Sequence, residues 1–131
     1  MASELAAELF GLKVAETKIQ DLAANATRFL VLGPKGAEPS GRDRTTILAM
    51  AQDGPGALLR LLEPLARRGL NLSRIQSRPT RRKLWEYAFF LDVEGHAEDP
   101  LLAEALVEVQ SACASMKILG SYPQAVSEVA R

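Results

Sequence analysis

Two short segments of this sequence contain residue types that could bind an anion. The first is D-G-P-G-A-L at residues 53–58, between an apolar run and an amphipathic run. Its two glycines would let the backbone approach a ligand closely. If a helix begins here, the N–H groups of Gly56, Ala57 and Leu58 lack acceptors within the helix and attract a carboxylate. An ordinary glycine turn has the same spacing, so spacing alone leaves both interpretations open.

The second segment is Q-S-R-P at residues 76–79, which ends an apolar stretch. The Arg78 guanidinium could pair with a carboxylate or with a neighbouring subunit. Pro79 lacks an N–H group and would end a strand ladder. The alternative is an edge strand that simply finishes in a turn.

The composition excludes several classes of protein. The chain has 131 residues, 47% of them hydrophobic, with sixteen basic and sixteen acidic side chains. One Cys and one His exclude a disulfide framework and a Cys/His metal cluster, and no residue constellation predicts a metal or another cofactor. We expect Cys113 to be a small buried hydrophobe and His96 to lie solvated in a loop. No apolar run approaches about 20 residues and no signal peptide is evident, so we expect a cytoplasmic protein.

The charge is uneven along the chain. Residues 35–86 carry eleven bases and five acids, whereas residues 87–131 carry two bases and seven acids. These charges fit two solvated faces that complement each other within or between chains, or a basic docking patch.

Residues 45–123 predict a complete α+β domain, followed by a tail at 124–131. Its pattern is strand, helix, strand, strand, helix, strand, which gives a ferredoxin-like four-stranded antiparallel sheet under two helices. The predicted strands span 45–51, 70–80, 84–95 and 115–123, and the predicted helices span 56–68 and 99–113. The apolar positions change parity between Leu72 and Ile75, which indicates a bulge. Pro64 should kink the first helix or end it early.

Successive side chains of the third predicted strand alternate between the two faces of the sheet. One face holds Trp85, Tyr87, Phe89, Leu91 and Val93, and it must be the face that the helices cover. The other face carries Phe90 with smaller or charged residues, so it is only partly apolar.

The first 33 residues predict a short helix at 2–10 and two strands at 12–19 and 27–32. One helix and two strands cannot bury a core alone, so we interpret residues 1–33 as part of something larger. Residues 34–44 are rich in glycine and proline, as is typical of a linker. The G-P-K-G run lacks the spacing of a phosphate-binding loop.

Several of these motifs, taken in order, resemble a known family. The runs GALL (56–59), LNLSRIQSRP (70–79), WEYAFFLD (85–92) and SMKILGSYP (115–123) closely resemble the regulatory ACT domain of prephenate dehydratase. They are most similar to the version in bifunctional chorismate mutase–prephenate dehydratases. TRFLVLG (27–33) resembles the segment that closes that family's catalytic domain, which makes residues 1–33 its C-terminal remnant.

The resemblance implies a function and a set of residues. The family converts prephenate to phenylpyruvate, water and carbon dioxide, and its ACT domains bind L-phenylalanine where two of them meet. A homodimer or larger homo-oligomer is therefore implied. Thr27, Arg28 and Phe29 match an incomplete catalytic site, in which the threonine hydroxyl assists departure of the ring hydroxyl. The implied effector-binding residues are Asp53, Gly54, Pro55, Gly56, Ala57, Leu58, Asn71, Leu72, Gln76, Ser77, Arg78 and Pro79. Gln76 departs from the family's usual glutamate, which implies weaker sensitivity to phenylalanine.

Two other functions compete with this interpretation. An ACT domain of a different amino-acid-regulated protein would share most of the pattern. An RNA-recognition module also has the βαββαβ order and aromatic residues on its third strand. However, its glycine motif is missing here, and these aromatic residues belong to the face that helices should cover. We therefore expect neither nucleic acid nor membrane as a partner.

Overall fold

The computed structural model describes residues 2–17, 19, 28–52, 54–79 and 87–125. The chain divides into two units at Gly33. The second unit contains, in order, β1 (Asp43–Ala51), α2 (Ala57–Arg67), β2 (Leu72–Pro79), β3 (Tyr87–Glu94), α3 (Pro100–Ala112) and β4 (Cys113–Pro123). This order confirms the predicted βαββαβ pattern.

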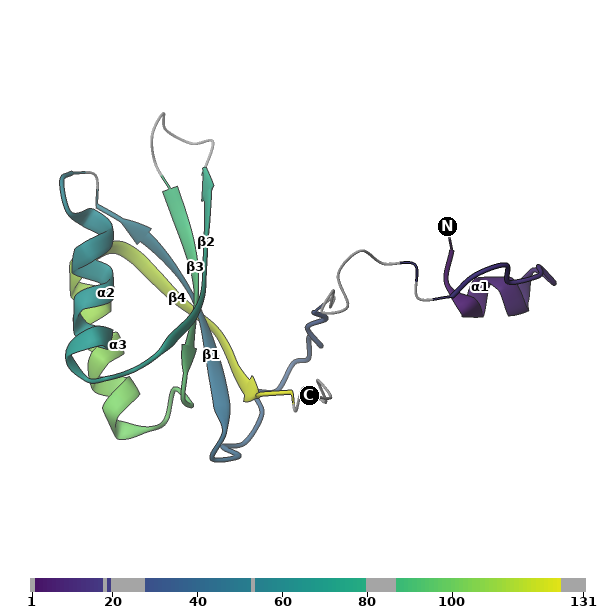
Figure 1. The fold of residues 1–131 in the computed structure, drawn as a ribbon. Helices are drawn as coiled ribbons and strands as arrows, with labels where there is room; N and C mark the ends of the chain where they lie inside the picture. The colour runs from purple at the N-terminus through teal and green to yellow at the C-terminus, as the bar shows by residue number, and fades with distance from the viewer. Residues whose placement is uncertain (1, 18, 20–27, 53, 80–86, 126–131) are drawn as a thin grey trace. The chain divides into compact units, whose positions relative to one another are not determined.

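The four strands form one antiparallel sheet in the order β2-β3-β1-β4, with both helices on the same face (Figure 1). The β2–β3 register shifts between Leu72 and Arg74, which confirms the predicted bulge. β2 and β4 are the edge strands, and one face of the sheet has no helix over it.

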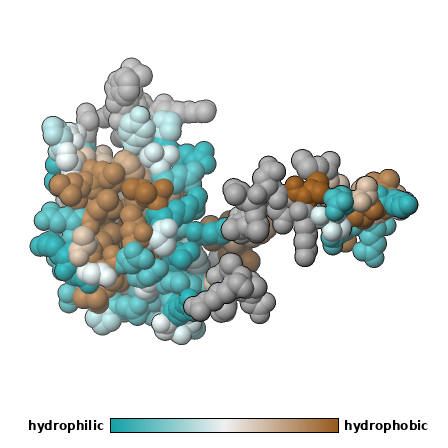
Figure 2. All heavy atoms as spheres, viewed as in Figure 1, coloured by the Kyte–Doolittle hydropathy of each residue, from teal (hydrophilic) through white to brown (hydrophobic). Residues whose placement is uncertain are grey.

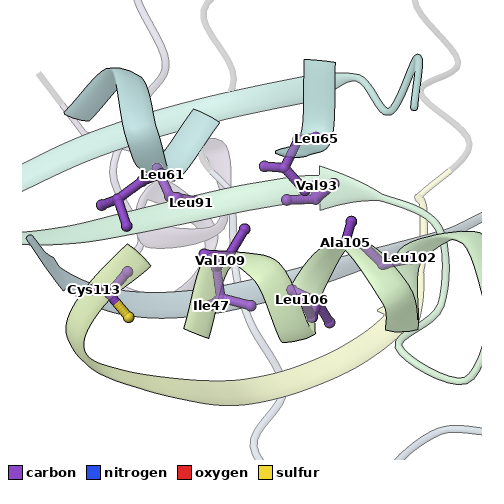
Figure 3. Packing of buried hydrophobic residues seen from close by; sticks show 11 residues of the cluster. Ile47, Leu61, Leu65, Leu91, Val93, Leu102, Ala105, Leu106, Val109 and Cys113 are labelled. Atoms are coloured by element: carbon purple, nitrogen blue, oxygen red, sulfur yellow. The ribbon is translucent and has the colours of Figure 1, made fainter. Parts of the chain in front are cut away.

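The core lies between the helices and the sheet. Figure 3 shows Leu61 of α2 beside Leu91, and Leu65 of α2 beside Val93, both on β3. This packing confirms that the helices cover the face of β3 that carries Leu91 and Val93. The buried residues of α3 recur at helical spacing and form one stripe that faces the sheet: Leu102, Ala105, Leu106 and Val109. Cys113 is buried in the same cluster, as expected.

The helix α2 contains a proline and is tied to α3 by an ion pair. Pro64 does not end α2, which continues to Arg67 with the proline ring buried in the domain. Burial of the ring offsets the missing backbone hydrogen bond. Beyond it, hydrogen bonds from Arg68 to the Glu108 carboxylate lower the pKa of Glu108 and tie α2 to α3.

The open face of the sheet contains a buried carboxylate. Asp92 is only 1% exposed, although no helix lies over it. Thr46 Oγ1 donates a 2.6 Å hydrogen bond to Asp92 Oδ1, and the hydroxyls of Thr46 and Tyr122 lie 2.8 Å apart. Since the Thr46 proton is already used, Tyr122 donates to Thr46. The two bonds join β1, β3 and β4 across this face.

In the first unit, the structure corrects part of the sequence interpretation. The helix α1 (Glu4–Leu9) forms, and Ser3 Oγ accepts from the Ala6 N–H group at its start. The described residues of 12–19 and 27–32 do not form strands. A strand needs a neighbouring strand to accept its hydrogen bonds and cover its apolar side, and these residues have neither: Val31, for example, is 99% exposed.

Candidate effector-binding site

The first candidate segment forms the start of α2. Gly56 is the N-cap and has a left-handed backbone, with φ of 72°. Glycine adopts this conformation without the strain that a Cβ would add. The Gly56 carbonyl accepts the Arg60 N–H group at 3.0 Å, which closes the first turn of the helix.

Two of the three expected backbone donors remain available at this helix start. The Ala57 N–H group already donates to the Gly54 carbonyl at 3.2 Å, so the expected three free donors become two. Within the described part of the chain, the N–H groups of Gly56 and Leu58 have no acceptor. They lie at the positive end of the helix dipole, where an anion is stabilised.

Arg60 adds a positive charge that the sequence interpretation missed. Its Nη1 donates a 2.7 Å hydrogen bond to the Pro55 carbonyl, which holds the guanidinium over the first turn of α2. A Cβ placed on Gly56 would lie 3.5 Å from the same nitrogen. The available signal was spacing, because residues four apart share one face of a helix.

An aromatic surface lies at the same end of the sheet. Leu65 packs beside Val93 and Leu61 beside Leu91. Leu58 lies about one turn earlier in α2, and Phe89 lies two residues earlier in β3 on the same face as Leu91. The following residue on this face is Tyr87. Its ring centroid is 6.5 Å from that of Phe89. Tyr87 is 42% exposed, since it lies beyond the first residues of α2. Figure 2 shows a hydrophobic area between α2 and the sheet in this half of the unit.

The second candidate segment lies on the edge strand β2. Gln76 pairs with Phe90 and Arg78 with Ala88, which places both side chains on the open face of the sheet. Arg74 Nη2 donates a hydrogen bond to Gln76 Oε1. Ser77 and Pro79 alternate to the other face. The described residues of β2 thus carry two cations and no acid.

Asn71 and Leu72 lie at the opposite end of the domain from Gly56. Asn71 follows the C-terminus of α2, and its carbonyl accepts the Glu94 N–H group at 2.9 Å. α2 has 11 residues and therefore spans about 16 Å between the two positions (Figure 1). One copy of the chain does not bring them together.

The remaining predicted site residues stand apart. Asp53 and Thr27 lie outside the described residues. Arg28 and Phe29 belong to the first unit, where the Phe29 side chain is exposed. In the described part of the chain, no group of three His, Cys, Asp or Glu side chains could hold a metal ion, and no helix is long and apolar enough to cross a membrane.

Comparison with known families defines the class of protein. Residues 45–110 match the family model of the ACT domain. This match covers half of the chain, and the observed sheet order agrees with it. The chain therefore belongs to the ACT domain family.

The comparisons also connect the chain to one kind of enzyme. Residues 1–37 match the prephenate dehydratase family model. The chain is 44% identical to the bifunctional chorismate mutase/prephenate dehydratase of Aquifex aeolicus over 126 residues, which cover 96% of this chain and 35% of that protein. The chain therefore spans about a third of the length of this relative.

Solved structures with similar folds have more than one described activity. A prephenate dehydratase from Arthrobacter aurescens, solved in complex with L-Phe, is 41% identical with a TM-score of 0.63, over 70% of this chain and 30% of that one. A structure described as GqqA, a novel type of quorum quenching acylase, is 35% identical with a TM-score of 0.66, over 72% and 48% of the two chains. The two neighbours have different described activities, so similarity of fold does not by itself assign an activity to the whole protein.

Proposed function

We propose that this chain is the regulatory part of a prephenate dehydratase and that it binds L-phenylalanine for feedback inhibition. In the whole protein, which we expect in the cytoplasm, the regulated reaction is conversion of prephenate to phenylpyruvate, water and carbon dioxide. The observation that carries the proposal is the start of α2, where two free N–H groups and Arg60 lie at the same end of the domain as the partly exposed ring of Tyr87.

The carboxylate and the phenyl ring of the amino acid each have a counterpart at this site. The carboxylate accepts from the N–H groups of Gly56 and Leu58 and lies near the Arg60 guanidinium. Charge-assisted hydrogen bonds of this kind contribute about 1.5–3 kcal/mol each. The phenyl ring packs near Tyr87 and Phe89, where an aromatic pair adds about 0.5–1.5 kcal/mol beyond the area that it buries.

A second copy of the chain completes the site in this proposal. Asn71 and Leu72 are separated from Gly56 by the length of α2, so they reach the same ligand only from another copy. A two-fold axis would place the α2 N-terminus of each copy beside the Asn71 end of the other and create two equivalent sites.

Gln76 adjusts the regulation. The amide replaces the carboxylate that the family usually has, and its oxygen accepts a hydrogen bond from Arg74. A neutral acceptor binds this guanidinium less strongly than a carboxylate would. The edge strand is therefore held less firmly at this position, and we expect weaker sensitivity to phenylalanine. In a Gln76→Glu variant, the affinity for phenylalanine should rise.

Calorimetry with L-phenylalanine, L-tyrosine and L-tryptophan tests the proposal. We expect phenylalanine to bind most tightly and Arg60→Gln to weaken it about tenfold, the effect of one charge-assisted bond. Glu63→Gln, which changes one charge on an exposed position of the same helix, should leave the affinity unchanged. Preference for tyrosine or tryptophan would assign the chain to another amino-acid-regulated protein. No binding of any of the three would refute the site.

A further inference from the structure

The only histidine of the chain is buried within the second unit, against the segment that precedes β1. His96 follows Gly95 between β3 and α3 and is 5% exposed, so the expectation of a solvated loop histidine is wrong. Its backbone N–H group donates to Asp99 Oδ2 at 2.7 Å, which holds the residue in the turn before α3.

Both ring nitrogens of His96 have partners. The Glu98 N–H group donates to Nδ1 at 3.2 Å, so Nδ1 carries no proton. The proton is therefore on Nε2, which lies 3.1 Å from the carbonyl oxygen of Ala37 and donates to it. Ala37 is 59 residues away in sequence and is the last residue of the prephenate dehydratase match.

The residues after Ala37 are fastened as well. The Asp43 carboxylate accepts from the N–H groups of Ser40 and Gly41, at 2.8 and 3.0 Å, and from the Ser40 hydroxyl at 2.6 Å. The Gln124 N–H group, just after β4, donates to the Arg42 carbonyl at 2.9 Å. Half of the expected linker is thus hydrogen-bonded into the ACT domain.

We propose that residues 37–43 are a strap that His96 fastens to the ACT domain, so that the free tether between the first unit and the fastened residues is only Gly33–Gly36. A free tether of eleven residues could reach about 36–40 Å, whereas four residues reach about 14 Å. The glycines at both ends of the short tether supply rotation, and Pro34 between them restricts it.

The strap matters because of where it lies. It enters β1 at Asp43, and the proposed effector site begins beyond the other end of the same strand, at Gly54. Within the second unit, the fastened segment and the proposed effector site therefore lie at opposite ends of β1. This inference concerns the junction and does not depend on which ligand binds.

Limited trypsin digestion of the full 131-residue chain, followed by mass spectrometry, tests the strap. Trypsin cuts after Lys35, in the short tether, and after Arg42, inside the strap. We expect fast cleavage after Lys35 and slow cleavage after Arg42. His96→Ala should speed cleavage after Arg42 about fivefold, the factor for one lost hydrogen bond of ordinary strength, without changing cleavage after Lys35.

Two control variants separate the bond from general loosening. His96→Gln keeps a donor near the position of Nε2 and should restore part of the protection. Gln110→Ala, at an exposed position of α3, should digest like the unaltered chain.

A second measurement does not require any variant to fold. Because the chain has one histidine, ring nitrogen chemical shifts from NMR report its tautomer without ambiguity, and we expect the Nε2–H form. Equal cleavage after Lys35 and Arg42 in the unaltered chain would overturn the strap. The role of His96 would be overturned by the Nδ1–H tautomer. It would also be overturned if His96→Ala left the rate of cleavage after Arg42 unchanged.

Discussion

Among single residues, Asp43 makes the stability of the fold depend on pH, because its carboxylate accepts hydrogen bonds from the neighbouring backbone. Hydrogen bonds from the Ser40 hydroxyl, the Ser40 N–H group and the Gly41 N–H group lower the pKa of this carboxyl below its ordinary value. A carboxyl with a lowered pKa in the folded state stabilises the fold above its ordinary pKa. That contribution is lost as the pH falls through the folded-state value.

Asp43→Asn should therefore flatten the acid limb of the stability profile. We expect the urea midpoint of the unaltered chain to decline between about pH 5 and pH 3 more steeply than that of the variant. Urea unfolding followed by circular dichroism across this range measures both. Equal slopes would mean that the hydrogen bonds to Asp43 do not contribute to the free energy of unfolding.

Among the elements, α3 joins the core to the turn that holds His96. It begins after Asp99, with Pro100 in its first turn, and carries the buried stripe that covers the sheet. Two adjacent leucines of this helix differ sharply: Leu102 is 0% exposed and Leu101 is 50% exposed. They form a matched pair for measuring what burial contributes.

Leu102→Ala should lower the free energy of unfolding by about 2–5 kcal/mol, because it removes buried methyl groups and leaves a cavity. Leu101→Ala should change it by less than about 0.5 kcal/mol, since its side chain already contacts water. Urea unfolding of the two variants measures the difference. Similar losses in both would contradict the packing of α3 on the sheet.

At the scale of the whole molecule, a site shared by two copies predicts that phenylalanine and self-association are coupled. The central third of the chain is basic and the last third acidic, which favours contacts between unlike parts of two copies. A ligand that binds only the dimer stabilises it by about 2.7 kcal/mol at a hundredfold excess over its dissociation constant, for each site. Sedimentation velocity at low micromolar protein should therefore show more dimer when phenylalanine is present. A monomer that binds phenylalanine and stays monomeric would place the site within one chain.

The chain alone should not convert prephenate. The catalytic residues that we propose in this chain, Thr27, Arg28 and Phe29, would be only a part of a catalytic site, and the described residues around them form no sheet that could position a substrate. We expect no phenylpyruvate from the purified chain in an absorbance assay. Turnover that increases with protein concentration and disappears in Thr27→Ala would contradict this prediction.

Patterns short enough to be read locally predicted much of this protein. The buried stripe of α3 follows from helical spacing, and the bulge in β2 follows from the change of parity after Leu72, because side-chain direction depends only on the local backbone. The start of α2 at Gly56 was also visible in the sequence. Tertiary structure decided the rest, since it depends on what lies across from a residue. The strands expected at 12–19 and 27–32 lack a neighbour to pair with. His96 is buried where Ala37, 59 residues earlier, returns to accept a hydrogen bond from its Nε2, and Arg60 lies over the start of α2 because its guanidinium turns back to the Pro55 carbonyl.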